Sequence, residues 1–85
     1  MSWELLLAKS TRKNITRFPR KDQLRIRETL YDLVINHYSG DIEKIKGEKN
    51  TWRRRVGNYR ILYEINTKDR IIFIADIRRR TSKTY

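Results

Sequence analysis

The fold is decided by residues 52–65, which read W-R-R-R-V-G-N-Y-R-I-L-Y-E-I. In the second half of this stretch large apolar residues occupy every second position: Tyr59, Ile61, Tyr63 and Ile65. A period of two is typical of a β-strand, whose side chains point alternately to two faces. Gly57-Asn58 separates this run from the shorter run before it, and such a pair favours a tight hairpin turn. The stretch therefore predicts two antiparallel strands joined at residues 57–58.

Further strands are predicted on both sides of this hairpin. Residues 70–77 are almost continuously apolar, as expected for a central strand, and the polar residues 66–69 before them indicate a turn. Residues 3–7 predict a short strand near the start of the chain. Residues 41–50 are mostly polar and predict a loop, which can contain a short strand or turn.

Two helices are predicted between the first strand and this loop. The first covers residues 10–18, with Ser10 or Thr11 as its cap, and Pro19 interrupts it because a proline disfavours helical conformation in the residue before it. The second covers residues 21–38 and ends at a Ser-Gly pair. Helices followed by a meander of strands indicate one α+β domain over residues 1–85.

The second helix carries two apolar stripes. The first, which is predicted to cover the sheet, consists of Ile26, Leu30, Leu33 and His37. The second consists of Leu24, Tyr31, Ile35 and Tyr38. For this second stripe we favour packing on the first helix over a surface left for a partner.

The composition indicates a basic domain that binds a polyanion. The chain has 85 residues with 21 Lys+Arg and 10 Asp+Glu, a formal net charge of +11. Residues 52–85 hold 10 basic and 3 acidic residues, so this shorter part carries +7 of the excess. Nucleic acid, an acidic protein or an anionic membrane can each supply the opposite charge. Because the excess is mostly arginine set among aromatic residues, we favour nucleic-acid contact over a merely solvated surface.

The composition also excludes several kinds of site. The chain has no cysteine and one histidine, so it offers no disulfide, no thiolate metal site and no zinc site. No apolar run approaches the roughly 20 residues that span a bilayer. Residues 1–4 (M-S-W-E) lack the basic start of a signal peptide, so we expect a cytoplasmic protein with no membrane partner.

The arginines of the hairpin are predicted to share one face of the sheet. Strand alternation sends Arg53 and Arg55 to the side opposite the apolar residues of their strand. Arg60 joins them on this open face if the apolar residues face the helices, and residues 78–80 (R-R-R) add cations at its rim. Like charges this close repel, so the cluster indicates an anion-binding site; the alternative is a solvated face. Alternation places Arg54 on the same face as the apolar residues of its strand, and at a sheet edge its long side chain can extend outward to solvent.

These residues resemble the RelE/ParE toxin superfamily, and its RelE branch in particular. The resemblance rests on Lys46-Gly47, on the run from Trp52 to Glu64 with its R-V-G-N-Y-R-I-L-Y core, on Ile77-Arg78-Arg79-Arg80 and on Tyr85. It covers nearly the whole chain, since a short strand, two helices and the proline between them also fit. It implies a RelE-like fold, with two N-terminal helices packed on a small curved antiparallel β-sheet.

The resemblance also implies an activity and a partner. RelE-like toxins are metal-independent mRNA endonucleases without a cofactor, which cut codons in the ribosomal A site. A ribose 2′-hydroxyl attacks the adjacent phosphate and leaves a 2′,3′-cyclic phosphate and a free 5′-hydroxyl. A cognate antitoxin, encoded beside the toxin, holds it inactive. The net charge of +11 predicts that the antitoxin binds with an acidic or amphipathic segment, for which the second apolar stripe is a candidate surface.

The family's basic residues map onto this sequence by motif. The catalytic positions fall on Arg53 and Arg55 of the basic strand, on Arg60 after the glycine turn, on Arg79 late in the last strand, and on the terminal Tyr85. Arg78 or Arg80 replaces Arg79 if the register slips. Further RNA contacts are expected from the other cations around these motifs: Lys46, Lys49, Arg54, Arg78, Arg80 and Lys83.

Physical chemistry supports two of these roles independently. Negative charge builds on the phosphoryl oxygens in the transition state, and one guanidinium can bind two of them, so Arg60 and Arg79 are candidates for a clamp. The ring of Tyr85 can stack on an unpaired base, a contact worth about 1–3 kcal/mol. As the last residue it can instead fray.

One departure from the family concerns the general base. Family members often carry lysines on the basic strand, one of them a proposed base, whereas this strand has only arginines. A guanidinium rarely gives up its proton because its pKa lies above about 12. Lys46, Lys49 and Glu64 stay open as candidates, beside catalysis by orientation and charge stabilisation alone. The single histidine, His37, is predicted to be a core residue.

Two other functions stay open. A ParE-like toxin of the same fold inhibits DNA gyrase by binding, without nuclease chemistry, and the missing lysines fit that function. A non-catalytic RNA- or ribosome-binding module needs the basic face alone. The basic strand, Arg79 and Tyr85 favour the endonuclease, which acts on mRNA on the ribosome and is expected to contact rRNA.

Overall fold

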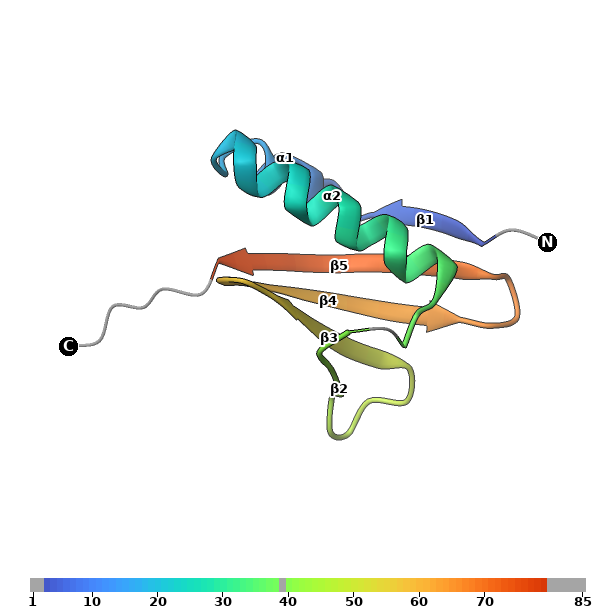
Figure 1. Ribbon diagram of the computed structural model, residues 1–85. Helices are drawn as coiled ribbons and strands as arrows, with labels where there is room; N and C mark the ends of the chain where they lie inside the picture. Colours follow the sequence, from blue (N-terminus) through green and yellow to red (C-terminus); the bar gives the residue numbers. More distant parts are fainter. Residues whose placement is uncertain (1–2, 39, 80–85) are drawn as a thin grey trace.

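The domain is a sheet with two helices on one of its sides (Figure 1). The computed structural model describes residues 3–38 and 40–79. Its elements are β1 (Glu4–Leu7), α1 (Lys9–Ile15), α2 (Arg20–Ile35), β2 (Ile42–Lys44), β3 (Thr51–Val56), β4 (Tyr59–Asn66) and β5 (Ile71–Arg79). In the described part of the chain no helix covers the other side of the sheet, which we call the open face (Figure 1).

The strands form one five-stranded sheet in the order β1-β5-β4-β3-β2. All neighbouring strands are antiparallel except β1 and β5, which are parallel. Short turns join β3 to β4 and β4 to β5, and such turns require antiparallel pairing. The two helices lie between β1 and the other strands in the sequence. β1 forms one edge of the sheet and is parallel to its neighbour β5. The α+β fold with two helices on a mostly antiparallel sheet is confirmed.

The core lies between α2 and the sheet. Ile26, Leu30 and Leu33 of the first stripe enter it, and none is more than 6% exposed. The sheet contributes the alternating residues of the hairpin and their neighbours on β5: Val56, Tyr59, Ile61, Tyr63, Ile65, Ile72, Ile74 and Ile77. α1 is joined to β5 by the buried hydroxyl of Thr11, which donates to the carbonyl of Ala75 at 2.9 Å. This single apolar layer holds the small domain together.

Both helices are shorter than predicted. α1 ends at Ile15 and α2 at Ile35, each three residues before its predicted end. Asn36 ends α2 because it leaves the helical conformation (φ −145°, ψ 101°). Its side-chain Oδ1 accepts a hydrogen bond from the backbone N–H of Tyr38 at 3.1 Å. His37 therefore lies beyond the helix. It is half-buried, and its ring packs at 4.0 Å against that of Trp3, at the edge of the core.

The second stripe of α2 is exposed, so the prediction that it packs inside the domain is wrong. The exposed fractions are 52% for Leu24, 56% for Tyr31, 83% for Ile35 and 53% for Tyr38. The physical reason is that α1 has about two turns and packs on β5, so it does not extend along α2. An apolar face of this kind indicates a partner. Neither described helix has the length and hydrophobicity to span a bilayer.

Candidate nucleic-acid interface

Three arginines form a row across the open face. Arg55 on β3 lies directly opposite Arg60 on β4, and Arg60 lies directly opposite Arg78 on β5. Directly opposed residues share a face, with Cβ atoms about 4.5–5.5 Å apart. Since Tyr59 and Ile61 enter the core on either side of Arg60, the row points away from the helices. Like charges in one row repel each other, so an anion gains binding energy here.

The turn between β3 and β4 creates this register. Gly57 has φ +56°, a left-handed conformation that glycine adopts without steric cost. The two-residue turn leaves Val56 paired with Tyr59, so that Arg55 and Arg60 become the next pair along the hairpin. The G-N pair in the sequence is therefore what brings the first two arginines of the row together.

Arg60 is the most enclosed member of the row. It is half-buried, whereas Arg55 and Arg78 are exposed. Its Nε is buried and has no hydrogen-bond partner among residues 3–38 and 40–79. Leaving such a group unsatisfied costs about 1–3 kcal/mol. Within the same residues neither Arg55 nor Arg60 makes an ion pair with a carboxylate, so an anion from outside is the natural partner.

Carboxylates flank the row without neutralising its centre. Arg78 donates from Nε to Oδ2 of Asp76 at 2.6 Å. Arg53 pairs with Glu43 of the neighbouring strand β2. Both pairs are exposed, and exposed pairs contribute about 0–1 kcal/mol each. A polyanion can therefore displace these carboxylates.

Tyr59 joins the hairpin to the helix layer. Its hydroxyl donates to Oδ2 of Asp22, in the first turn of α2, at 2.6 Å. Burial raises the pKa of Tyr59, and the hydrogen bond and negative charge of Asp22 raise it further. Sequence reasoning missed Asp22, because an acidic residue in the first turn of a helix is common for its favourable interaction with the helix dipole. The alternation of the strand predicted that Tyr59 faces the core, and a buried hydroxyl needs a hydrogen-bond partner. This was the one indication of the contact that the sequence offered.

Comparison with known proteins identifies the family. A family model described as the ParE toxin of the type II toxin–antitoxin system parDE matches residues 6–83. The chain belongs to the RelE/ParE toxin superfamily.

Relatives of this toxin extend over almost its whole length. Toxin RelE3 of Methanocaldococcus jannaschii is 37% identical over 86 residues, which cover 96% of this chain and 97% of the relative. An archaeal RelE–RelB complex from Pyrococcus horikoshii matches with 25% identity and a TM-score of 0.81 over 98% of this chain and 100% of that chain. A RelB–RelE antitoxin–toxin complex from Methanococcus jannaschii matches with 31% identity and a TM-score of 0.71 over 87% and 88%. The toxin therefore has the RelE fold.

A bulge on β5 decides which late arginine of the toxin joins the row. Ala75 is an extra residue there, because the residues on either side of it pair with consecutive residues of β4. Arg79 consequently lies opposite Tyr59 on the helix side, while Arg78 points to the open face. The two candidates for the clamp, Arg60 and Arg79, therefore lie on opposite faces of the sheet, and the register alternative, Arg78, takes the place in the row.

Arg54 also lies off the row. It is directly opposite Ile61, which places it on the helix side of the sheet. Its guanidinium packs against Gly40 (φ +79°), where any Cβ atom would overlap it. Burial raises the pKa of Tyr63 to about 12, and the charge of Arg54 opposes this rise. The structure thus places Arg54 among the residues of the helix side, away from the predicted RNA surface.

The other predicted residues lie outside the row. Lys46 and Lys49 are exposed in the loop between β2 and β3. Glu64 is exposed on the open face, opposite Thr51, at the end of the hairpin far from Arg55. Four residues of strand span about 13 Å, so Glu64 is distant from the centre of the row. Three predicted residues lie outside the described residues: Arg80, Lys83 and Tyr85.

Proposed function

We propose that this toxin is a ribosome-dependent mRNA endonuclease of the cytoplasm, and that Arg55, Arg60 and Arg78 bind the scissile phosphate. The observation that carries the proposal is the state of Arg60. Its Nε is buried, it has no partner among the described residues, and it stands between two like charges. A phosphate oxygen would accept charge-assisted hydrogen bonds from the accessible part of this half-buried guanidinium and offset the repulsion. The 37% identity with toxin RelE3 supports a toxic function for this chain.

The reaction that fits this site is a transesterification within the RNA strand. The ribose 2′-oxygen attacks the adjacent phosphorus and loses its proton, while the bond to the 5′-oxygen breaks. The products are a 2′,3′-cyclic phosphate and a 5′-hydroxyl that has gained a proton. Negative charge grows on the phosphoryl oxygens during the attack, and Arg60 can bind them through parallel N–H donors. The positive charges of Arg55 and Arg78 lower the electrostatic energy of the same phosphate.

The proposal assigns most of the rate enhancement to charge stabilisation and orientation. Arginines keep their protons, so the row stabilises an anion and does not act as a base. Glu64, a candidate base, is exposed and lies four residues from Arg60, about 13 Å along the strand. Tyr85 is proposed to stack on the base and so to hold the 2′-oxygen in line.

The experiment that tests the nuclease maps the 5′ ends of cellular mRNA after brief induction. The wild type is expected to cut translated messages in phase with codons. Arg60→Ala should lower the cutting about 10²–10³-fold, as the loss of one preorganised donor does elsewhere. Arg12→Ala is the matched control, because it removes the same charge from an exposed position on α1. Equal cutting by the wild type and Arg60→Ala would overturn the proposal.

A second candidate function is the inhibition of DNA gyrase by binding. Two observations favour it: the matching family model is described as a ParE toxin, and the basic strand β3 has no lysine. A supercoiling assay with purified toxin and gyrase separates the candidates. Loss of supercoiling without mRNA cutting selects gyrase inhibition. Ribosome binding without either effect selects a non-catalytic module.

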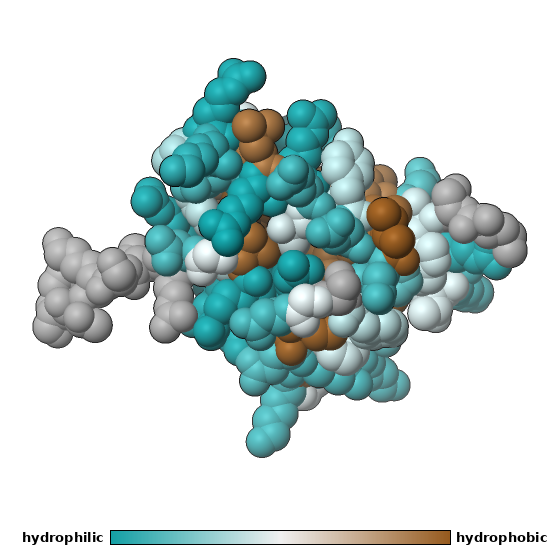
Figure 2. Space-filling model, viewed as in Figure 1, coloured by the Kyte–Doolittle hydropathy of each residue, from teal (hydrophilic) through white to brown (hydrophobic). Residues whose placement is uncertain are grey.

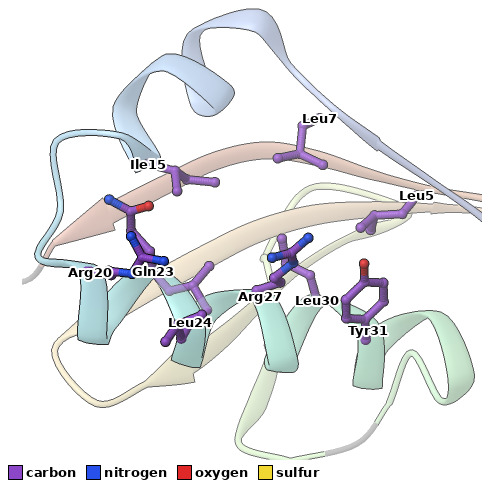
Figure 3. A pocket seen from close by; sticks show the side chains of 10 residues that line it. Leu5, Leu7, Ile15, Arg20, Gln23, Leu24, Arg27, Leu30 and Tyr31 are labelled. Atoms are coloured by element: carbon purple, nitrogen blue, oxygen red, sulfur yellow. The ribbon is translucent and has the colours of Figure 1, made fainter.

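We also propose that the helix layer binds an antitoxin. A groove of about 530 Å³ lies between α2 and the segment formed by β1 and α1 (Figure 3). Leu24 and Tyr31 of the exposed stripe line it together with Leu5 and Leu7. Figure 2 shows hydrophobic side chains interrupting the hydrophilic surface on the side where α2 lies. The two related toxins described above were crystallised with RelB antitoxins, which supports a partner of this kind.

The charge of the groove defines the chemistry of this partner. Arg20 and Arg27 line it, and none of its described lining residues is acidic. An amphipathic segment with acidic flanks is therefore attracted, whereas a second copy of the +11 chain is repelled. Leu24→Asp should abolish neutralisation of the toxin by the acidic antitoxin encoded beside it, and the toxicity of the variant should remain. Leu6→Asp, at a leucine 45% exposed on β1, is the control; equal neutralisation of both variants would contradict the proposed surface.

A further inference from the structure

We propose that the hydrogen bond between Tyr59 and Asp22 positions the arginine row for phosphoryl transfer. Both are positioning residues, because they lie on the helix side and do not reach the open face where RNA would bind. The activity that this pair would affect is the proposed mRNA cleavage, so the inference rests on that function.

The position of Tyr59 couples it to two members of the row. It directly precedes Arg60, and it pairs across the strands with Val56, which directly follows Arg55. A displacement of Tyr59 therefore moves the backbone from which both guanidiniums extend. The Tyr59 hydroxyl is held at 2.6 Å from Oδ2 of Asp22. Asp22 is in turn fixed in the first turn of α2, where its backbone nitrogen donates to the carbonyl of Pro19 at 2.9 Å.

Two further contacts tie the same end of the hairpin to the helix layer. The ring of Phe18 packs on the ring of Tyr59, with centroids 4.7 Å apart. Arg25, one turn after Asp22, lies over the β3–β4 turn, where a Cβ on Gly57 would come within 3.3 Å of its Nη1. The hairpin end that bears the row is thus held by several contacts from the helix layer, and the partly buried hydrogen bond between Tyr59 and Asp22 is the directional one.

Tyr63 provides a matched comparison on the same strand. It is 0% exposed against 4% for Tyr59, and its hydroxyl also donates to the helix layer, to the carbonyl of His37 at 2.5 Å. Tyr63 lies four residues further along β4, about 13 Å from Tyr59, and its neighbours on the open face are Leu62 and Glu64. A loss of the Tyr63 hydroxyl should therefore affect stability alone, whereas a loss of the Tyr59 hydroxyl should also affect the reaction.

The decisive experiment measures kcat and KM for ribosome-dependent cleavage by the purified toxin. Tyr59→Phe should lower kcat about 10–100-fold, because displacements of the order of 1 Å at reacting groups have effects of this size. Its KM should stay near the wild-type value, because the charges that attract RNA are unchanged. Tyr63→Phe should keep the wild-type kcat although it loses a comparable hydrogen bond. Equal kcat values for the two variants would overturn the inference.

Substitutions of Asp22 provide a rescue test. Asp22→Asn keeps an oxygen that can accept the Tyr59 hydrogen bond, and it should retain most of kcat. Asp22→Ala removes the acceptor and should match Tyr59→Phe. If Asp22→Asn lost as much kcat as Asp22→Ala, the carboxylate charge rather than the position of Tyr59 would be the cause, and the inference would fail.

A measurement without cleavage separates this inference from the proposed function. The NMR resonance of the Arg60 Nε–H and the hydrogen exchange of the residue 55–60 amides both report on the row. Tyr59→Phe should shift the resonance and speed the exchange, and Tyr63→Phe should change neither. A wild type that does not cleave mRNA would refute the proposed function and leave this test intact. A cleaving wild type with no response to Tyr59→Phe would refute the positioning role alone.

Discussion

The two faces of β4 differ in what their residues do. On the helix side Tyr59, Ile61, Tyr63 and Ile65 are at most 4% exposed, and both tyrosine hydroxyls donate hydrogen bonds. On the open face Arg60 has a buried Nε with no partner among the described residues, and Arg55 and Arg78 repel it from either side. One strand thus contributes to the core on one face and to the proposed phosphate site on the other. Substitutions on the two faces should separate stability from cleavage, except at Tyr59, whose hydrogen bond is proposed to position the row.

The largest effect is expected on the open face. Arg60→Leu removes the central charge of the row, so cleavage of translated mRNA should fall about 10²–10³-fold. The free energy of unfolding should stay equal or rise, because two contacts between like charges disappear. Primer extension measures the first quantity and urea denaturation the second. A variant that lost activity because it had lost stability would show that the two faces are not independent.

On the helix side the largest effect is a dependence of stability on pH. Burial raises the pKa of Tyr63 from 10.0 to about 12. Between these values the folded state keeps the phenolic proton and the unfolded state loses it, so the free energy of unfolding falls as the pH rises. The full shift corresponds to about 3 kcal/mol. Urea denaturation from about pH 9 to about pH 12 should show this fall for the wild type and a smaller one for Tyr63→Phe; parallel curves would contradict it.

The next largest effect tests the register of β5 against β4, which decides whether Arg78 or Arg79 faces the open side. Arg78→Ala removes an end of the row and should lower cleavage about tenfold, the size of one hydrogen bond to a charged group. Arg79→Ala removes the same charge from the helix side and should leave cleavage within about threefold of the wild type. Single-turnover cleavage with purified ribosomes compares the two. A larger loss for Arg79→Ala would show that Arg79 reaches the phosphate in the complex.

The smallest effect is expected from a conservative change in the core. Ile61→Val removes one methylene from a fully buried side chain next to Arg60. The free energy of unfolding should fall by about 0.5–1.5 kcal/mol, and cleavage should be unchanged at a temperature where the variant is folded. Urea denaturation and primer extension measure both. A loss of cleavage like that of Arg60→Leu would mean that core packing also sets the geometry of the row.

The sequence predicted the hairpin and two members of the row, because local rules determine them. A period of two and a Gly-Asn turn place Arg55 opposite Arg60 without reference to the rest of the chain. Strict alternation from Ile72 and Ile74 would have sent Arg79 to the open face. The bulge at Ala75 reverses the faces after it, and no residue type in that strand marks the bulge.

The partner of Tyr59 and the exposure of the second stripe depend on tertiary structure. Asp22 lies 37 residues from Tyr59. The local pattern indicates that the Tyr59 hydroxyl needs a partner, but it does not indicate that Asp22 is this partner. The second stripe has the same spacing whether it is covered or exposed. Its exposure follows from the short length of α1, which the capping signals did not reveal.

The bulge at Ala75 has a consequence for how members of this superfamily are aligned. Adding or deleting one residue beside it would turn every later side chain of β5 to the opposite face, and one of the neighbouring arginines would replace Arg78 in the row. Such a change could pass unnoticed in a tract of three arginines. Arginines in the same alignment column can therefore hold different positions in the hydrogen-bond ladder, and the ladder decides which of them are equivalent.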